Sequence, residues 1–411
     1  MRKAYLMFFL STLFFCYEFM LRVSLGVMAN ELMLTFSISA TVLGLLGSVF
    51  FQAYAWMQIP VGIIFDRFST RKTLAFSCFI CAVGTLIFSL ATTVPMLMIS
   101  RILIGAGAAF GFVGTLKIAE QWLPATRFAL LTGMLATIGF LGAVASDNAL
   151  TYLFQHFGWR QVFLYAALLG VILSILIFVL IKDVQVRHAF PHVIKFRAYL
   201  QFVARLCTNR FILLNSIIGL CLYFPTSAFA ELWGKSYLQV VLKLTSVQAT
   251  LSVSMIFLGW AVGSLIQGWV YDKIQQTKLL FTVNSLLAAL FICIVLYASL
   301  TSFYLIATCL FLFGLFSSCE IINFAYAKKN SSAEISATAM AFTNIFVILG
   351  GVFAQPVIGW LLDENWHGGL SNGIRIYSLT AYHLAFLVIP GMLCIAAILA
   401  QFLKDNHSSL P

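Results

Sequence analysis

The sequence predicts an all-α membrane protein with twelve transmembrane helices arranged as two six-helix bundles. Of its 411 residues, 62% are hydrophobic and only 9% are charged, and its mean hydropathy is +1.01. A soluble domain carries about 25% charged residues, so most of this chain cannot face water. A membrane span needs about 20 apolar residues, and short polar connections divide the chain into segments of about that length.

Twelve apolar segments follow one another, and each is expected to form one crossing. The expected crossings are 5–28, 40–64, 73–92, 97–119, 128–153, 161–181, 211–233, 248–270, 279–299, 303–326, 336–361 and 380–403. The longest polar stretch, from Lys182 to Arg210, separates six crossings from six. We therefore expect an N-terminal bundle over 1–182, a cytoplasmic linker over 183–210 and a C-terminal bundle over 211–411. An amphipathic surface helix is expected around 194–208.

Charged and reactive residues exclude several classes of protein. The formal net charge is +11, which in a soluble chain would point to nucleic acid. In a membrane protein, basic residues gather in cytoplasmic loops, so we expect lipid around the chain and no nucleic acid partner. The sequence carries no metal-ligand cluster, nucleophile motif or phosphate-binding loop, and its nine cysteines lie almost entirely within apolar segments. We therefore expect neither an enzyme nor a cofactor.

The basic residues also predict an orientation. If both termini lie in the cytoplasm, 17 of the 24 Lys and Arg residues fall in cytoplasmic segments, four fall outside and three lie within spans. This asymmetry follows the positive-inside rule. The expected location is a plasma membrane or a bacterial inner membrane, and the expected state is a monomer.

The two halves of the chain carry a related hairpin. After the second span the sequence reads GIIFDRFSTRK from Gly62 to Lys72, and after the eighth it reads GWVYDKIQQTK from Gly268 to Lys278. Both copies place an Asp and a basic residue four and five positions after a glycine. Parallel repeats are typical of transporters that bind substrate between two bundles and rock around it.

This hairpin, the twelve spans and the basic central loop together resemble the major facilitator superfamily, over the whole chain. RILIGAGAA, from Arg101 to Ala109, is similar to the pattern of that superfamily's fourth span, and GWRQVFLY, from Gly158, is similar to the start of its sixth. The resemblance implies that the hairpins control the change of conformation, and that Arg101 either contributes to it structurally or relays protons. The residues concerned are Gly62, Asp66, Arg67, Arg71, Lys72, Arg101, Asp272 and Lys273.

The first apolar segment contains Arg22. The stretch YEFMLRVSLGV, from Tyr17 to Val27, resembles the first span of the organic-anion branch of the superfamily, which includes sialin, the vesicular glutamate carriers and bacterial anion:cation symporters. In that branch the arginine faces the central cavity. Ala108 stands where the branch usually carries a proton-coupling glutamate. The fifth span lacks the Gly-Pro signature of drug/proton antiporters, since Phe140 follows Gly139.

Physical chemistry also favours an anion site at Arg22. A guanidinium within a membrane costs from about 3 to more than about 10 kcal/mol unless it faces a cavity or a partner. Its planar fork suits a carboxylate or a phosphate, so we expect Arg22 to anchor an anion. Two other interpretations stay open: an internal pair with Glu18, one turn away, and a side chain that extends to the membrane surface.

Four further residues are expected to contribute to the substrate site. Lys117, near the cytoplasmic end of the fourth span, either faces the cavity or extends to the membrane surface. Tyr17 and Tyr223 are expected to line the cavity, although most aromatic residues of such a chain pack against lipid or other helices. Asn344 lies on a span that usually borders the cavity in the superfamily.

Acidic residues within the spans are the candidates for proton coupling. Glu320 lies mid-span beside two serines and an asparagine, and either exchanges a proton or hydrogen-bonds a neighbour. A carboxyl group removed from water takes up a proton more readily. Glu18 competes with it, because substrate at Arg22 would disturb its pairing, and Asp147, nearer the outer face, is a third candidate. Glu231 is expected at a helix end.

The sequence therefore predicts a secondary active transporter that moves a small organic anion by alternating access, in symport with protons. One alternative is a proton-coupled exporter of amphipathic compounds or siderophore-type metabolites, which an apolar cavity would favour. Another is a membrane sensor that has kept the fold and lost transport. The hairpin in both halves argues against the sensor.

Overall fold

The computed structural model describes residues 2–124, 128–183, 206–298, 300–331, 336–371 and 374–404. Among these, eleven helices are long and apolar enough to cross a membrane. The N-terminal half contains α1 (Arg2–Val27), α2 (Ala29–Phe36), α3 (Ala40–Arg67), α4 (Thr70–Leu90), α5 (Val94–Trp122) and α6 (Phe128–Leu180). The C-terminal half contains α8 (Arg210–Ala228), η2 (Phe229–Trp233), α9 (Gly234–Val240), α10 (Ser246–Ile274), α11 (Thr277–Tyr297), α12 (Phe303–Ser317), η3 (Ser318–Ile321), α13 (Ile322–Lys329), α14 (Ser336–Glu364), β1 (Leu370–Ser371), β2 (Ile374–Arg375), α15 (Leu379–Phe386) and α16 (Val388–Ala400).

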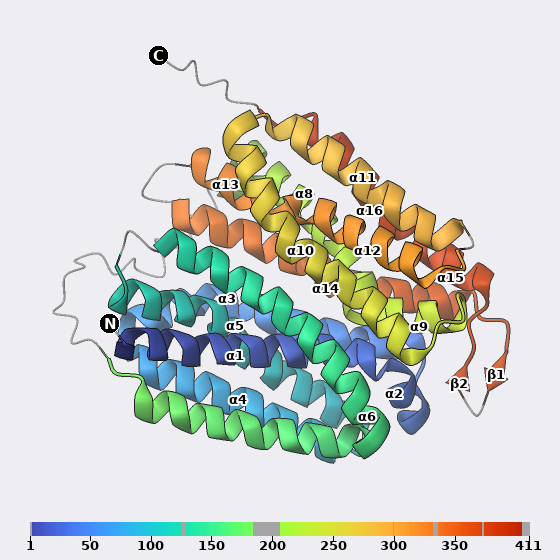
Figure 1. Ribbon diagram of the computed structural model, residues 1–411, viewed down its shortest axis with the longest axis horizontal. Coiled ribbons are helices and arrows are strands. Elements are labelled where there is room, and N and C mark those ends of the chain that lie inside the picture. Colours follow the sequence, from blue (N-terminus) through green and yellow to red (C-terminus); the bar gives the residue numbers. More distant parts are fainter. Residues whose placement is uncertain are drawn as a thin grey trace.

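The 53-residue element α6 accounts for two crossings. A straight helix of that length would measure about 80 Å, more than twice the hydrocarbon core of a bilayer. The helix breaks at Gly158, whose φ of 73° is accessible to glycine and strained for other residues. The chain reverses there, as the two arms of α6 in Figure 1 show. The twelve predicted crossings are confirmed.

Polar side chains mark where several helices begin. Ser69 accepts a hydrogen bond from the backbone N–H of Lys72 at 3.1 Å, at the start of α4. At the start of α10, Thr245 and Gln248 form a reciprocal capping box. Each bond satisfies a backbone donor that has no partner within its own helix.

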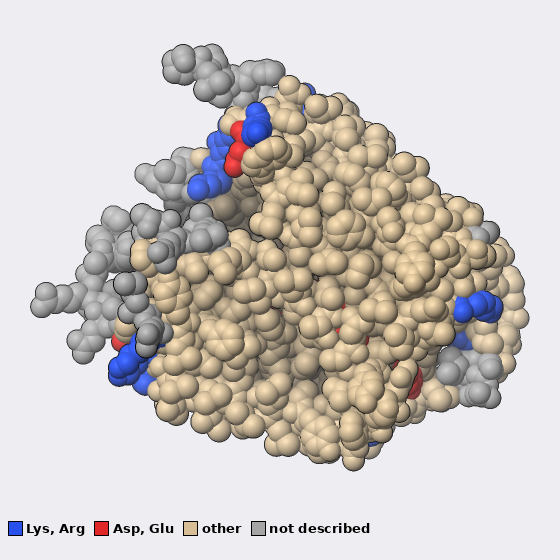
Figure 2. Space-filling model, in the orientation of Figure 1, with Lys and Arg blue, Asp and Glu red and all other residues tan. Residues whose placement is uncertain are grey.

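Apolar side chains cover the flanks of the molecule. Leu265, Trp269 and Tyr304 are 59%, 60% and 79% exposed. Figure 2 shows a broad face almost without charge, with most of the visible charged side chains gathered at its ends. Exposed apolar surface is unfavourable in water and favourable in lipid. The chain is therefore a multi-pass integral membrane protein.

Close backbone contacts join the two halves at one end of the bundle. Helix α3 crosses α14 at two glycines. A Cβ on Gly44 would lie 2.4 Å from the carbonyl oxygen of Gln355, and one on Gly359 would lie 2.3 Å from the carbonyl oxygen of Ala40. Small residues allow such approach between membrane helices, and here only glycine fits without a backbone shift.

Asp363, near the end of α14, connects the same two helices. Its Oδ2 accepts hydrogen bonds from the backbone N–H and the hydroxyl of Thr41, at 2.8 and 2.6 Å. Its Oδ1 accepts from the hydroxyl of Tyr377 at 2.6 Å and from Arg375 at 3.0 Å. Burial and the bond to Asp363 raise the pKa of Tyr377, so its phenol stays protonated. We call this end of the bundle, at the right of Figure 1 beside β1 and β2, the sealed end.

Most of the predicted linker lies outside the described residues, which resume at Leu206. The amphipathic helix expected around 194–208 falls almost wholly in that part of the chain. The domain limits at 182 and 211 therefore stay a prediction.

We predict that Gly44→Val opens the sealed end. Overpacking a close contact costs about 1–3 kcal/mol, so the fraction of molecules open at this end should rise about tenfold. Ser48, which is buried and donates to the carbonyl of Val352 at 2.7 Å, provides a reporter position. The thiol of Ser48→Cys should react about tenfold faster with a membrane-impermeant maleimide when Gly44 is replaced by Val.

A matched control is Gly391→Val on α16, where an added Cβ would meet no described atom within 4 Å. It should leave the labelling rate unchanged. All variants carry Ser in place of the exposed Cys207 and Cys394. Equal rates in Gly44→Val and its parent would show that this crossing does not hold the end closed.

Candidate functional site

Arg22 of α1 lies where the two halves meet, and protein encloses it. Its side chain is 7% exposed. Its Cζ lies 4.9 Å from the centre of the Phe51 ring, 5.3 Å from that of Phe19 and 5.5 Å from that of Tyr223. Aromatic faces attract a guanidinium, most strongly where water is excluded. The side chain does not extend to the membrane surface.

The counter-ion of Arg22 comes from the opposite half. Arg22 Nε lies 3.1 Å from Oε1 of Glu231, which is 2% exposed. The hydroxyl of Tyr223 donates a hydrogen bond to the same oxygen at 2.8 Å and accepts one from Arg22 Nη2. We call these three residues the Arg22 cluster. Within the described part of the chain, Arg22 thus pairs with Glu231, while Glu18 makes no ion pair with it.

A π-helical turn places Glu231. The turn η2 interrupts the helical run between α8 and α9, and the N–H of Gly234 bonds to the carbonyl of Phe229. From the opposite half, a Cβ on Gly26 would lie 2.6 Å from the carbonyl oxygen of Glu231. The two backbones are therefore in direct contact beside the ion pair. π turns are rare, and they are frequent at functional sites.

The sequence interpretation of Glu231 was wrong about its position. We expected it at a helix end, but the helical run continues through the π turn to Val240. A carboxylate within the apolar run Ala228 to Trp233 was the signal that should have included it among the candidates.

Two more charged side chains lie beside the Arg22 cluster. Glu18 is 0% exposed, neither of its carboxylate oxygens has a hydrogen-bond partner among the described residues, and its Cγ packs toward Gly111 of α5. Arg101 of α5 is 1% exposed and donates to the carbonyl of Leu21 at 2.8 Å. Buried polar groups without partners are rare and call for a functional or solvent explanation.

The other predicted substrate residues have different surroundings. The hydroxyl of Tyr17 lies 3.3 Å from Oγ1 of Thr85, inside the N-terminal half. Lys117 pairs with Glu120 one turn along α5, at 3.1 Å. Asn344 is partly buried on α14. The structure brings Tyr223 to Arg22, and it places Tyr17 and Lys117 on other partners.

Glu320 lies on η3, the short 3₁₀ turn between α12 and α13. It is 6% exposed, and its Oε1 finds no hydrogen-bond partner in the described ranges. The side chain of Asn323 donates to the backbone carbonyl of Glu320 at 2.9 Å, not to its carboxylate. The carboxylate is therefore buried, and no cation of the described part pairs with it.

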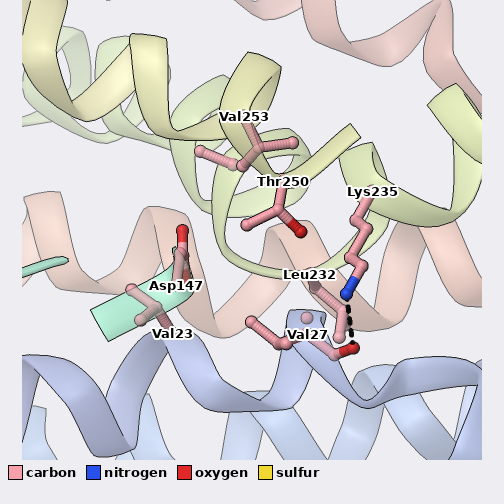
Figure 3. Close-up of a pocket in the computed structure, with 9 residues that line it drawn as sticks. Val23, Val27, Asp147, Leu232, Lys235, Thr250 and Val253 are labelled. Atoms are coloured by element: carbon pink, nitrogen blue, oxygen red, sulfur yellow. Dashed lines mark hydrogen bonds between the residues drawn. The ribbon is translucent and has the colours of Figure 1, made fainter. Parts of the chain in front are cut away.

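Asp147 lines a small pocket between the halves (Figure 3). Opposite it, Lys235 donates to the carbonyl of Val27 at 3.1 Å and to Oγ1 of Thr151 at 3.3 Å. The remaining lining includes Gly26 and Ala230, the latter next to Glu231. The pocket thus borders the Arg22 cluster.

In the first hairpin, Arg71 pairs with Asp183, an acid that the sequence interpretation did not single out. Arg71 Nε lies 3.6 Å from Asp183 Oδ2. Asp183 also accepts hydrogen bonds from the hydroxyl of Ser69 at 2.5 Å and from the backbone N–H of Arg71 at 3.1 Å. The end of the sixth crossing is therefore bonded to the start of α4.

The other hairpin residues make fewer contacts among the described residues. Gly62, Arg67 and Lys72 are exposed, and the side chain of Asp66 lies outside the described part. In the second hairpin, Lys273 Nζ lies 4.0 Å from the centre of the Trp269 ring, and Asp272 is exposed.

We predict strong coupling between Arg22 and Glu231. Arg22→Met leaves a buried carboxylate without its cation, so the free energy of unfolding should fall by about 3–5 kcal/mol. Glu231→Met should cost a similar amount. The double variant replaces the pair with apolar groups and should recover most of the loss. Thermal and denaturant unfolding of the detergent-purified protein measures all four, and losses that simply add would contradict the coupling.

Comparison with known proteins agrees with this architecture. A sequence model of the Major Facilitator Superfamily matches residues 7–354. The chain is 24% identical to the membrane sensor protein UhpC of Escherichia coli (strain K12), covering 90% of this chain and 88% of the relative. It is 21% identical to the probable galactarate/D-glucarate transporter GudP of Bacillus subtilis (strain 168), and the match covers 95% of this chain and 92% of that relative. It is 24% identical to the hexuronate transporter of that organism, and the match covers 88% of this chain and 81% of that relative.

Solved structures share the fold. An inward-facing, unoccupied bacterial homologue of the human lysosomal transporter Spinster superposes with a TM-score of 0.78 at 15% identity, covering 97% of this chain and 95% of that one. A point mutant of the nucleoside transporter NupG superposes with a TM-score of 0.78 at 14% identity, and the match covers 97% of this chain and 99% of that one. The chain belongs to the Major Facilitator Superfamily, and it is a membrane transporter rather than an enzyme.

Proposed function

We propose that this protein carries a small organic anion across a bacterial inner membrane in symport with protons, with Arg22 as the anion anchor. The observation that supports this function best is the position of Arg22. It is buried at the contact between the halves, its guanidinium is surrounded by aromatic rings, and its counter-ion is a carboxylate supplied by the protein itself. A substrate carboxylate offers Arg22 the same chemistry as Glu231.

The names of several relatives fit this chemistry. GudP is named for galactarate and D-glucarate, and another relative is named for hexuronate. A probable hexose phosphate transport protein of Chlamydia trachomatis also matches over 79% of this chain. Carboxylates and phosphates both suit the planar donors of a guanidinium. We therefore infer that sugar acids and sugar phosphates are the first classes to test.

A rocking mechanism fits the arrangement of the two halves. The halves meet at the sealed end, opposite the basic hairpins. If the basic loops face the cytoplasm, as the positive-inside rule predicts, the described state is closed to the outside. Opening the sealed end would break the glycine crossings and the Asp363 bonds, while the hairpins would close the other end. The protein would work as a monomer, and buried carboxylates, Glu18, Glu320 and Asp147 among them, would supply the proton site.

Anion binding by the purified protein tests this function. A ligand that binds the folded state raises its apparent thermal stability by mass action, by about 2.7 kcal/mol at a hundredfold excess over Kd. We expect D-glucarate, D-glucuronate or glucose 6-phosphate to raise the melting temperature, more at acidic than at alkaline pH. Arg22→Gln and Arg22→Lys should lose the response, because neither offers the planar fork. Arg210→Gln, at an exposed arginine, should keep it.

A response to cations or apolar drugs alone would favour the exporter. An anion response that survives in Arg22→Gln would exclude Arg22 as the anchor. Anion binding without uptake into proteoliposomes would favour a sensor, the role in the printed name of UhpC.

A further inference from the structure

The Arg22 cluster is occupied in a way that limits how a substrate can bind. Glu231 Oε1 takes contacts from both Arg22 and Tyr223, while Oε2 is buried with no hydrogen-bond partner in the described part of the chain. An incoming carboxylate that uses the guanidinium fork needs the position Glu231 holds. Glu231 and the substrate therefore compete for one cation.

The charged and titratable groups around Glu231 come from several elements. They are Arg22 and Glu18 on α1, Arg101 on α5, Asp147 on α6 and Tyr223 on α8. The two acids of this set, Glu18 and Asp147, are at most 3% exposed. Arg101 is directed to the carbonyl of Leu21, which leaves Arg22 as the described cation in direct contact with Glu231.

We propose that Glu231 occupies the anion site in the absence of substrate and binds the co-transported proton when substrate displaces it from Arg22. This inference rests on the proposed function. A buried carboxylate that loses its cation is strongly destabilised as an anion, and protonation relieves that penalty. One proton from the open side joins a Glu231 carboxylate oxygen, and one substrate carboxylate takes its place on Arg22. For a monoanion such as D-glucuronate, the charge of the site is the same before and after the exchange.

The exchange also bears on the change of conformation. Arg22 and Glu231 belong to different halves, so their ion pair holds the halves together beside the backbone contact at Gly26. Anion and proton together remove that link without leaving a bare charge. Either one alone leaves an unpaired carboxylate or an unpaired guanidinium. Symport follows because only the empty and the doubly loaded sites are free of buried unpaired charge.

The contacts of Glu231 differ from those of Glu18 and Glu320, the carboxylates that the sequence predicted as proton sites. Glu18 makes no ion pair with Arg22, and no donor of the described residues reaches its oxygens. Glu320 lies on η3, and no described cation pairs with it. Neither has to move when an anion binds Arg22. Glu231 does, and substrate binding changes its charge state directly.

Glu231→Gln tests the proposal, because glutamine keeps the shape of the side chain and cannot titrate. Binding of D-glucarate and D-glucuronate, whose carboxylates stay ionised, is measured by thermal shift from mildly acidic to alkaline pH. In the wild type, affinity linked to one proton should fall about tenfold per pH unit on the alkaline side. In Glu231→Gln it should be independent of pH. Glu231→Asp, which keeps a titratable acid, should retain a pH dependence, and Glu364→Gln, at an exposed acid, should match the wild type.

Proton movement gives a second readout. In proteoliposomes with an internal pH dye, uptake of the anion by the wild type should acidify the lumen, and Glu231→Gln should lose most of that signal while anion exchange continues. A Glu231→Gln protein that keeps the wild-type pH slope and proton uptake overturns this inference alone. A wild-type protein that binds none of the anions overturns the proposed function and this inference with it.

Discussion

A guanidinium buried between two helical bundles needs a negative charge, and in this protein Glu231 supplies it from the opposite bundle. The Arg22–Glu231 pair explains why a π turn interrupts the seventh crossing, since that turn directs the carboxylate toward α1. It also explains why Gly26 lies opposite, where no larger residue would let the backbones meet. A buried ion pair contributes little net stability compared with apolar packing, but removing one partner is expensive. Such a pair determines how the two halves are placed against each other more than it adds to the stability of the fold.

The two ends of the bundle are held by different kinds of contact. At the sealed end, Gly44 and Gly359 bring backbones together, and Asp363 accepts hydrogen bonds from the start of α3 and from the loop after α14. At the basic end, the partly exposed ion pair of Arg71 and Asp183 lies within the N-terminal half and does not join the two halves. Exposed pairs are weak and break easily in water. Close apolar packing is harder to undo, so closure at the sealed end rests chiefly on shape.

The interior also contains carboxylate oxygens that have no hydrogen-bond partner among the described residues. Both carboxylate oxygens of Glu18 and Oε1 of Glu320 are buried with no hydrogen-bond donor of the described part beside them. In a protein selected for stability alone, such groups would be destabilising. The organic-anion branch, which this chain resembles, usually carries an acid in the fourth span, where this chain has Ala108 on α5. Glu18 of α1 nevertheless packs toward Gly111 of the same helix α5. The interior thus keeps acidic side chains near Arg22 although their positions along the chain differ.

Composition and periodic breaks determined the membrane class and the twelve crossings, because solvation by lipid demands apolar segments of one length whatever their packing. The family was indicated by the resemblance of the repeated hairpin and the span motifs. The sequence also singled out Arg22, since a cation in an apolar segment is conspicuous without any knowledge of its neighbours. It did not reveal Glu231, because a charge near the expected end of a segment reads as a helix end until the π turn is seen. Nor did it show that Tyr17 turns toward Thr85 while Tyr223 meets Arg22. These side-chain contacts depend on how each helix is rotated about its axis and on which helices of the two halves face each other. Only the packed bundle determines both.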